Sequence, residues 1–352
     1  MVSVIMPLYN AERFLDETIQ SVLNQTYKNY ELIIIDDCGQ DGSLDIAKKY
    51  AKQDKRIKIY SNKENKGIAY SRNRGLHEAR GEYIALLDDD DIAMPNRLEL
   101  QVKYLDNHPE IGTIGGNAQW IDENNNVIRE TIDVVSDPDT IRMFFLFRNL
   151  FNNSEMTFRK SIVEKNGIKY HDGYYGMEDF HFWVCFLHFS KATMLTDLLL
   201  KKRVFAHNET NKNKNNKAAL RAQKFFELQK LSLTLAGFTI DLKDEYVLKK
   251  YLAENDYFCK NMSELEELKS FLLNILIQAK KIDSNIYKNM QSWFSGLLMT
   301  HYENVGKLFF KEWQSDADLL VSPFEDKQKY IQDLITGNNF LMKIIENLKV
   351  DR

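Results

Sequence analysis

Cysteine is scarce in this sequence: Cys38, Cys185 and Cys259 are the three present, and they form no CxxC pair. This spacing argues against a disulfide framework or a cysteine zinc site and is typical of a reducing compartment. The opening residues, MVSVIMPLYN, lack the basic stretch and cleavage site of a secretion signal. We therefore expect a cytoplasmic location.

Long apolar runs and an excess of positive charge are also missing. No segment approaches the ~20 apolar residues that a membrane-spanning helix needs. We therefore expect at most a peripheral attachment at the cytoplasmic face of the inner membrane. The chain has 47 Lys and Arg against 51 Asp and Glu, a net charge of −4, which argues against a nucleic-acid partner. With 44% hydrophobic residues over 352 positions, it can bury a sizeable core.

The apolar pattern divides the chain into an α/β part and a helical part. Up to about residue 110, strand-like segments alternate with helix-like ones, which predicts βαβ units and a mainly parallel, doubly wound mixed sheet. Residues 113–130 predict an antiparallel hairpin, and 193–207 predict two short strands. Helices are expected near 137–148, 160–166 and 178–189.

The polar stretch NETNKNKNNK (208–217) predicts a loop or linker. We therefore predict an α/β domain over 1–212. A helical C-terminal domain is expected over 213–352.

Three predicted strands end in polar residues: PLYN (7–10), DDCGQDGS (36–43) and DDDD (88–91). In a parallel α/β sheet the carboxyl ends of the strands share one edge, where ligands bind. The four consecutive aspartates could be an acidic, solvated turn. Alternatively, their carboxylate oxygens suit Mg²⁺ or Mn²⁺, and such a cation would relieve the crowding of like charge.

These segments resemble the family 2 glycosyltransferases, which have the GT-A fold. The resemblance covers about residues 3–207. It depends on five segments in the family's order: SVIMPLYN, LNQTYKNYELIIIDDCGQDGS, NKGIAYSRNRGL, GEYIALLDDDDIAMPNRL and GMEDFHFW. The resemblance implies an inverting enzyme that transfers a sugar from a UDP-sugar to an acceptor hydroxyl. It also implies that residues 1–212 are the catalytic domain, with a nucleotide-binding half over about 1–110 and an acceptor half over about 111–212.

Carried onto this sequence, the resemblance implies a nucleotide pocket. Pro7 and Tyr9 would line it, with the Tyr9 ring stacked on the base. Asp37 would accept a hydrogen bond from uracil, and Asp36 would bind beside it or support the loop. Arg72 would lie near the nucleotide or diphosphate, or else stand on an exposed helix surface.

The same resemblance places a metal within the aspartate run. Asp88 would face the ribose and the Mn²⁺ or Mg²⁺ ion, and Asp90 would bind the ion. Asp89 and Asp91 would shape the turn, with Asp89 beside the donor. His207 could approach the metal or the diphosphate.

The acceptor side of the site would use a pair of acids. The resemblance implies that Asp179 is the general base and that Glu178 orients the acceptor or its loop. Both acids could instead complement the N-terminus of a helix. Asn152 or Asn153 could contact acceptor hydroxyls.

Two other functions are weighed against a glycosyltransferase. A sugar-phosphate nucleotidyltransferase also uses an α/β sheet and Mg²⁺, but it would have a Gly-rich basic loop where this chain has PLYNAERF. A non-catalytic nucleotide-sugar-binding subunit need not keep both acidic pairs.

The expected partners are a UDP-sugar donor and a glycan or lipid-linked saccharide acceptor of a bacterial surface polysaccharide. The helical C-terminal region could pack on the catalytic domain, form a homodimer, or attach to a membrane surface through FLMKIIENLKVDR (340–352).

Overall fold

The computed structural model describes residues 1–130, 134–174, 176–205, 218–252 and 258–294, together with 297, 298, 301 and 304. His207, the predicted linker at 208–217 and the segment 340–352 lie outside the described residues. Within the described part, no helix combines the length and the apolar character needed to cross a membrane.

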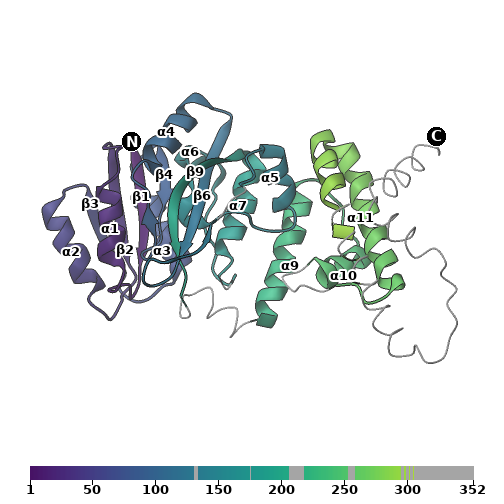
Figure 1. The fold of residues 1–352 in the computed structure, drawn as a ribbon, viewed down its shortest axis with the longest axis horizontal. Helices are drawn as coiled ribbons and strands as arrows, with labels where there is room; N and C mark the ends of the chain where they lie inside the picture. Colours follow the sequence, from purple (N-terminus) through teal and green to yellow (C-terminus); the bar gives the residue numbers. More distant parts are fainter. Residues whose placement is uncertain are drawn as a thin grey trace. The chain divides into compact units, whose positions relative to one another are not determined.

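The strands and helices follow the predicted alternation (Figure 1). The strands are β1 (Val2–Leu8), β2 (Tyr30–Asp36), β3 (Ile57–Ser61), β4 (Tyr83–Leu86), β5 (Ile92–Ala93), β6 (Ile111–Ile121), β7 (Val127–Glu130), β8 (Thr157–Arg159) and β9 (Lys191–Arg203). The helices are α1 (Leu15–Leu23), α2 (Ser43–Gln53), α3 (Ile68–Glu78), α4 (Arg97–Asn107), α5 (Pro138–Phe145), α6 (Lys160–Asn166), α7 (Glu178–Phe189), α9 (Ala218–Leu235), α10 (Leu242–Tyr251) and α11 (Met262–Ile282), with a short 3₁₀ helix, η1, at Asn153–Glu155.

The described strands form one nine-stranded mixed sheet in the order β3-β2-β1-β4-β8-β6-β9-β5, with β7 paired to β6. The first four strands in this order are parallel, and β8 joins them antiparallel to β4. Strands β6 and β9 are parallel to each other. This arrangement confirms the predicted α/β class and the mixed, mainly parallel sheet.

The sheet has a separate apolar core on each face because side chains of successive strand residues point to opposite sides. In β1, Val4 and Met6 pack with residues of α1, α2 and α4. Ile5, between them, packs with residues of α3, α5 and α7. Strand β2 is buried along its whole length, as expected of a strand covered on both faces. The predicted doubly wound arrangement is confirmed.

One strand-level prediction is wrong. Residues 191–203 form the single strand β9, not two short strands. Exposed Thr196 and Asp197 interrupt its apolar pattern and imitate a turn in the sequence. The pairing of β9 with β6 accommodates the interruption through register shifts near Asn117, so the strand continues.

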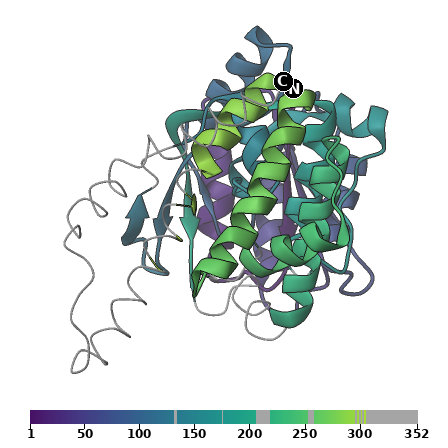
Figure 2. The same cartoon turned by 90° about the vertical axis from the view of Figure 1, so that its right-hand side faces the viewer.

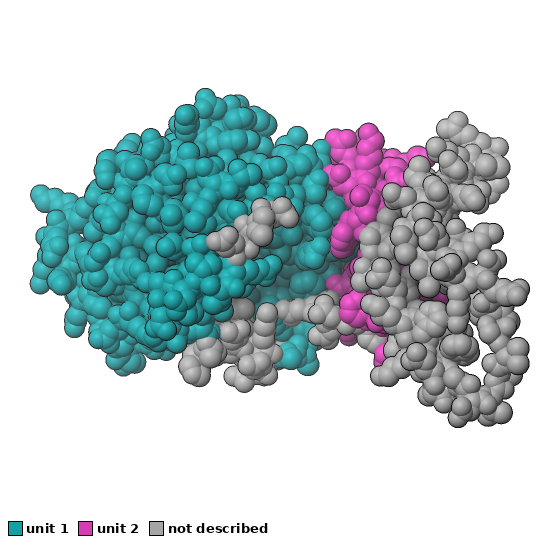
Figure 3. Space-filling model, viewed as in Figure 1, with its two compact units in different colours: residues 1–236 teal, residues 237–352 magenta. Residues whose placement is uncertain are grey.

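The chain separates into two compact units, residues 1–236 and 237–352 (Figure 3). Helix α9 is grouped with the first unit, and the predicted boundary at 212–213 falls outside the described residues. In the second unit, α10 and α11, drawn in green in Figure 2, are in contact, and apolar side chains on them such as Leu248 and Leu272 are buried. This unit agrees with the predicted helical character of the C-terminal region.

Candidate active site

Three strand ends meet at one edge of the sheet. Leu8 at the end of β1 pairs with Asp36 at the end of β2, and β4 lies parallel on the other side of β1. The loop after β1 is tied to the loop after β4, because the Tyr9 N–H donates to Asp89 Oδ2 over 2.9 Å. The predicted convergence of these segments is therefore observed.

The four aspartates at 88–91, here called the acidic quartet, do not have equivalent surroundings. Asp88 forms an ion pair with buried Arg72, with 2.8 Å between Nη2 and Oδ1. The Asp88 N–H donates to Ser154 Oγ. Burial would raise the pKa of Asp88, but Arg72 and then Lys202 outweigh it and the pKa is lowered. Asp88 is therefore the ionised, paired member of the quartet.

The other three carboxyl groups of the quartet resist ionisation. Burial, together with neighbouring aspartates, raises the pKa of Asp89 to about 7. Burial also raises the pKa of Asp91, whose Oδ1 accepts from the Arg203 N–H over 2.8 Å. The pKa of Asp90 is raised well above its usual value by burial and by the other three aspartates. A positive charge arriving beside Asp90 would relieve this repulsion.

Lys202 supplies positive charge to this region and was missed by the sequence reasoning. It is the next-to-last residue of β9, half-buried, and the residue after it donates to Asp91. Its ammonium acts electrostatically on Asp88, Asp90 and Asp91. The available signal was the run KKR at the end of a strand.

Buried Glu155 is a second residue that the sequence reasoning missed. It sits in η1, and its carboxylate accepts from the N–H and from the side-chain amide of Asn152. Burial raises the pKa of Glu155 to about 7, against the opposing effect of these hydrogen bonds and of Lys202. Asn153 Oδ1 accepts from the Trp183 indole, whereas Asn153 Nδ2 is buried without a hydrogen-bond partner.

On the predicted nucleotide side, Tyr9 and Asp37 differ sharply in exposure. Tyr9 is 48% exposed. Asp37 is buried and accepts three hydrogen bonds: from Asn62 Nδ2 at 2.6 Å, from the Lys66 N–H at 2.9 Å and from the Gly67 N–H at 2.8 Å. Asp37 thus holds the loop that precedes α3, and one acceptor position remains on its Oδ2.

Pro7 and Asp36 complete the set predicted for the nucleotide. Pro7 is half-buried within β1, opposite Ile35 of β2. Asp36 is buried, and its Oδ1 accepts from the Gly39 N–H at 3.4 Å. Both lie at the edge of the sheet where Tyr9 leaves β1.

The predicted acid pair opens helix α7. Asp179 Oδ1 accepts from the Phe180 N–H at 2.7 Å, and its Oδ2 accepts from Asn149 Nδ2 at 3.1 Å. Burial raises the pKa of Asp179, and the positive charge of Arg72 opposes this. Burial, followed by the charge of Asp179, also raises the pKa of Glu178.

Arg72 connects the two predicted acidic groups. It pairs directly with Asp88 and acts electrostatically on both Glu178 and Asp179. The structure thus brings Arg72, the acidic quartet and the acid pair into one region. Among the described residues, no three His, Cys, Asp or Glu side chains are grouped closely enough to hold a metal ion.

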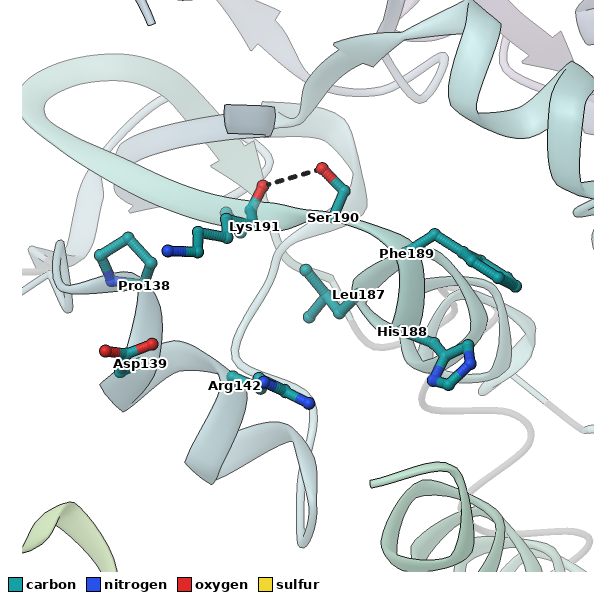
Figure 4. Close-up of a pocket in the computed structure, with 9 residues that line it drawn as sticks. Pro138, Asp139, Arg142, Leu187, His188, Phe189, Ser190 and Lys191 are labelled. Atoms are coloured by element: carbon teal, nitrogen blue, oxygen red, sulfur yellow. Dashed lines mark hydrogen bonds between the residues drawn. The ribbon is translucent and has the colours of Figure 1, made fainter. Parts of the chain in front are cut away.

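A cavity of about 210 Å³ lies elsewhere, between the start of α5, the end of α7 and the start of β9 (Figure 4). Arg142, His188 and Lys191 are among the residues that line it. None of the predicted site residues contributes, and β9 begins at this cavity but ends beside the acidic quartet.

The sequence matches relatives of known class. Residues 3–167 match the family described as "Glycosyl transferase family 2". An uncharacterised glycosyltransferase of Methanocaldococcus jannaschii is 33% identical over 263 residues, which cover 74% of this chain and 84% of the relative. The Escherichia coli UDP-Glc:alpha-D-GlcNAc-diphosphoundecaprenol beta-1,3-glucosyltransferase WfgD is 41% identical over 127 residues, or 36% of this chain and 49% of the relative.

The fold also has solved counterparts. The crystal structure of S. aureus TarS 1–349 in complex with UDP-GlcNAc aligns with a TM-score of 0.54 at 17% identity, covering 87% of this chain and 83% of that one. This likeness supports the fold alone and agrees with the predicted GT-A class. Together, the match at residues 3–167 and the relative from M. jannaschii show that this chain belongs to the family 2 glycosyltransferases.

Proposed function

We propose that the protein transfers a hexose or N-acetylhexosamine from a UDP-sugar to a hydroxyl of a growing bacterial surface glycan. The transfer is a single displacement that inverts the anomeric carbon and uses a divalent cation. Tyr9 and Asp37 receive the uracil, the acidic quartet receives the diphosphate with its cation, and Asp179 is the general base.

The observation that carries this proposal is the position of Arg72. One guanidinium pairs with Asp88 and also acts on Asp179. A diphosphate held at the quartet and an acceptor hydroxyl held at Asp179 would therefore lie on either side of a small common space, as a direct displacement requires.

The names of related proteins support the donor and the acceptor. The name of WfgD gives a UDP-sugar as donor and a diphosphoundecaprenol-linked sugar as acceptor. The TarS protein of similar fold was crystallised with UDP and with UDP-GlcNAc. A lipid-linked acceptor would bring this protein to a membrane surface, where we propose peripheral attachment.

The residues of the quartet suit a hard divalent cation such as Mn²⁺ or Mg²⁺. Asp90 has a carboxyl group whose ionisation is opposed by three neighbours, and a cation would favour its charged form. Asp90 and the free oxygen of Asp88 would hold the ion, and His207 is proposed as a further ligand. When bound, the ion would neutralise charge on the diphosphate.

Asp179 has the surroundings that a general base needs. Its pKa is raised by burial, which strengthens it as a base, while Arg72 keeps the ionised form accessible. The acceptor hydroxyl gives its proton to Asp179, and the hydroxyl oxygen forms a bond to the anomeric carbon. The bond from that carbon to the diphosphate breaks, and UDP leaves with the electron pair.

The alternatives have less support. Membership of the family 2 glycosyltransferases favours sugar transfer over nucleotidyl transfer. A non-catalytic binding subunit would not require the half-buried acid pair of α7, whose ionisation is opposed by partial burial.

A two-stage measurement tests the proposal. Thermal shift with UDP, GDP and CDP, each with Mn²⁺, Mg²⁺ or EDTA, should show the largest stabilisation for UDP with a divalent cation. Release of the nucleoside diphosphate is then measured from UDP-Glc, UDP-GlcNAc, UDP-Gal, UDP-GalNAc and GDP-Man. A preference for GDP over UDP, or no stabilisation by UDP at any cation concentration, would contradict the donor assignment.

A further inference from the structure

The acid pair of α7 is held by the segment that connects α5 to η1. Asn149 in this segment donates from Nδ2 to Asp179 Oδ2 over 3.1 Å. The orientation of the Asn149 amide follows from its other bond, because its Oδ1 accepts from the Phe151 N–H at 3.0 Å. The oxygen is therefore fixed toward Phe151, and the NH₂ group faces the carboxylate.

The same segment is anchored on α7 one turn beyond Asp179. The buried ring of Phe151 packs edge-on against Trp183 with 5.4 Å between ring centroids, and the Trp183 indole donates to Asn153 Oδ1 over 3.2 Å. Three contacts thus hold residues 149–153 to the helix that carries Asp179. Asn149 cannot shift without disturbing this packing.

We propose that Asn149 is a positioning residue for the general base, fixing the Asp179 carboxylate in one orientation through its amide. The remaining lone pairs of Asp179 are then directed to the acceptor hydroxyl. This inference rests on the proposed function and deepens it. The amide also favours the ionised carboxylate, because a hydrogen bond to a charged acceptor stabilises the charge.

Several charged or titratable groups near Asp179 affect its pKa. On its own helix Glu178 adds negative charge, and from the other elements the facing groups are Arg72, Asp88, Tyr170 and Lys202. Asn149 is a neutral donor beside this set, so its removal changes no charge. Its loss should therefore raise the pKa of Asp179 without altering the other groups.

The test compares Asn149→Leu and Asn149→Asp with wild type. Both substitutions keep nearly the same side-chain shape, and Asn149→Asp keeps the acceptor for the Phe151 N–H. The pH dependence of kcat/KM is measured with whichever nucleotide sugar of the five-donor panel the wild type hydrolyses fastest. The acidic limb should move to higher pH by about one unit in Asn149→Leu and further in Asn149→Asp.

Binding of UDP with Mn²⁺ should be unchanged in both variants. Asn107→Asp adds the same charge on the exposed end of α4 and should leave the profile unmoved. A uniform loss of rate at every pH in Asn149→Asp would overturn the inference while leaving the proposed function intact. Failure of the wild type to release any nucleoside diphosphate would overturn both the inference and the proposed function.

Discussion

Arg72 and Asp88 form an ion pair of 2.8 Å that ties helix α3 to the end of β4. The Arg72 side chain is 6% exposed and that of Asp88 28% exposed. The buried guanidinium also lies over the ring of Tyr170, with 5.4 Å between Arg72 Cζ and the ring centroid. The pair therefore contributes to the fold as well as to the proposed site.

Arg72→Ala should lower the free energy of unfolding by roughly 3 kcal/mol, since removing one partner leaves a mostly buried carboxylate unpaired. The loss is read from urea unfolding followed by circular dichroism. Arg13→Ala is the matched control: it breaks an ion pair with Glu123 whose side chains are 58% and 44% exposed. It should cost less than about 1 kcal/mol. Equal losses in the two variants would contradict the role of Arg72.

Asp90→Asn should have opposite effects with and without a cation. The raised pKa of Asp90 means that its ionised form opposes folding, so removing the charge should raise Tm in EDTA by roughly 2–4 °C per kcal/mol gained. The stabilisation by UDP with Mn²⁺ should largely disappear. Asp197→Asn, on an exposed residue of β9, should change neither quantity. A variant that keeps full cation-dependent UDP binding would exclude Asp90 as a ligand.

Glu155 should make the stability of the protein pH-dependent. Its pKa is raised to about 7 by burial, so the folded state binds its proton more tightly than the unfolded state does. The stability that this provides is present at low pH and is lost as pH rises from about 4.5 through about 7. The free energy of unfolding of Glu155→Gln, measured relative to wild type by urea unfolding in EDTA, should increase by roughly 1–3 kcal/mol as pH rises from 5 to 8. A constant difference across this range would contradict the assignment.

Asp179→Asn should keep nucleotide-sugar binding and lose transfer by about 10²–10⁴-fold, because the amide cannot accept the proton. Isothermal titration with the nucleotide sugar and Mn²⁺ measures the first quantity, and release of the nucleoside diphosphate in the presence of acceptor measures the second. Glu178→Gln should lose less. If the order of the two variants is reversed, the base is Glu178.

Tyr9→Ala should weaken UDP binding by about five- to 150-fold, the loss of one base-stacking contact of about 1–3 kcal/mol. Tyr9→Phe keeps the ring and should bind almost as wild type. Because Tyr9 is 48% exposed, neither substitution should shift Tm in the absence of nucleotide. If Tyr9→Phe binds UDP as weakly as Tyr9→Ala does, the Tyr9 hydroxyl and not its ring contributes to UDP binding.

The sequence was most informative where local pattern and long-range position agree. The apolar strands before Tyr9, Asp37 and Asp88 predicted that these residues share one edge of the sheet, because parallel strands place their carboxyl ends together. The family resemblance added the acid pair at Glu178 and Asp179. The fold class, the family and the enzyme class are confirmed, whereas the roles of the individual residues stay predictions.

The sequence could not predict which groups surround each side chain in the folded structure. Lys202 was marked only by the run KKR, and Glu155 by no recognisable motif. Lys202 reaches the quartet because β9 ends beside it, whereas Glu155 lies in η1 and binds Asn152. Asp37 is a further case: its three donors come from Asn62 and from two backbone N–H groups that only the folded loop brings near. Periodicity does not encode such contacts.

The register of strand β9 against β6 determines which positively charged side chain faces the acidic quartet. Lys202 faces the carboxylates, while its neighbour Arg203 donates to the Asp90 carbonyl and to Glu17. A slip of one residue against β6 would place Arg203 where Lys202 stands and would reverse every side chain of the strand. The irregular pairing near Asn117 thus sets the register of the part of β9 that carries Lys202. Single-residue insertions or deletions between residues 192 and 201 should therefore impair the site far more than substitutions of the exposed side chains in this segment.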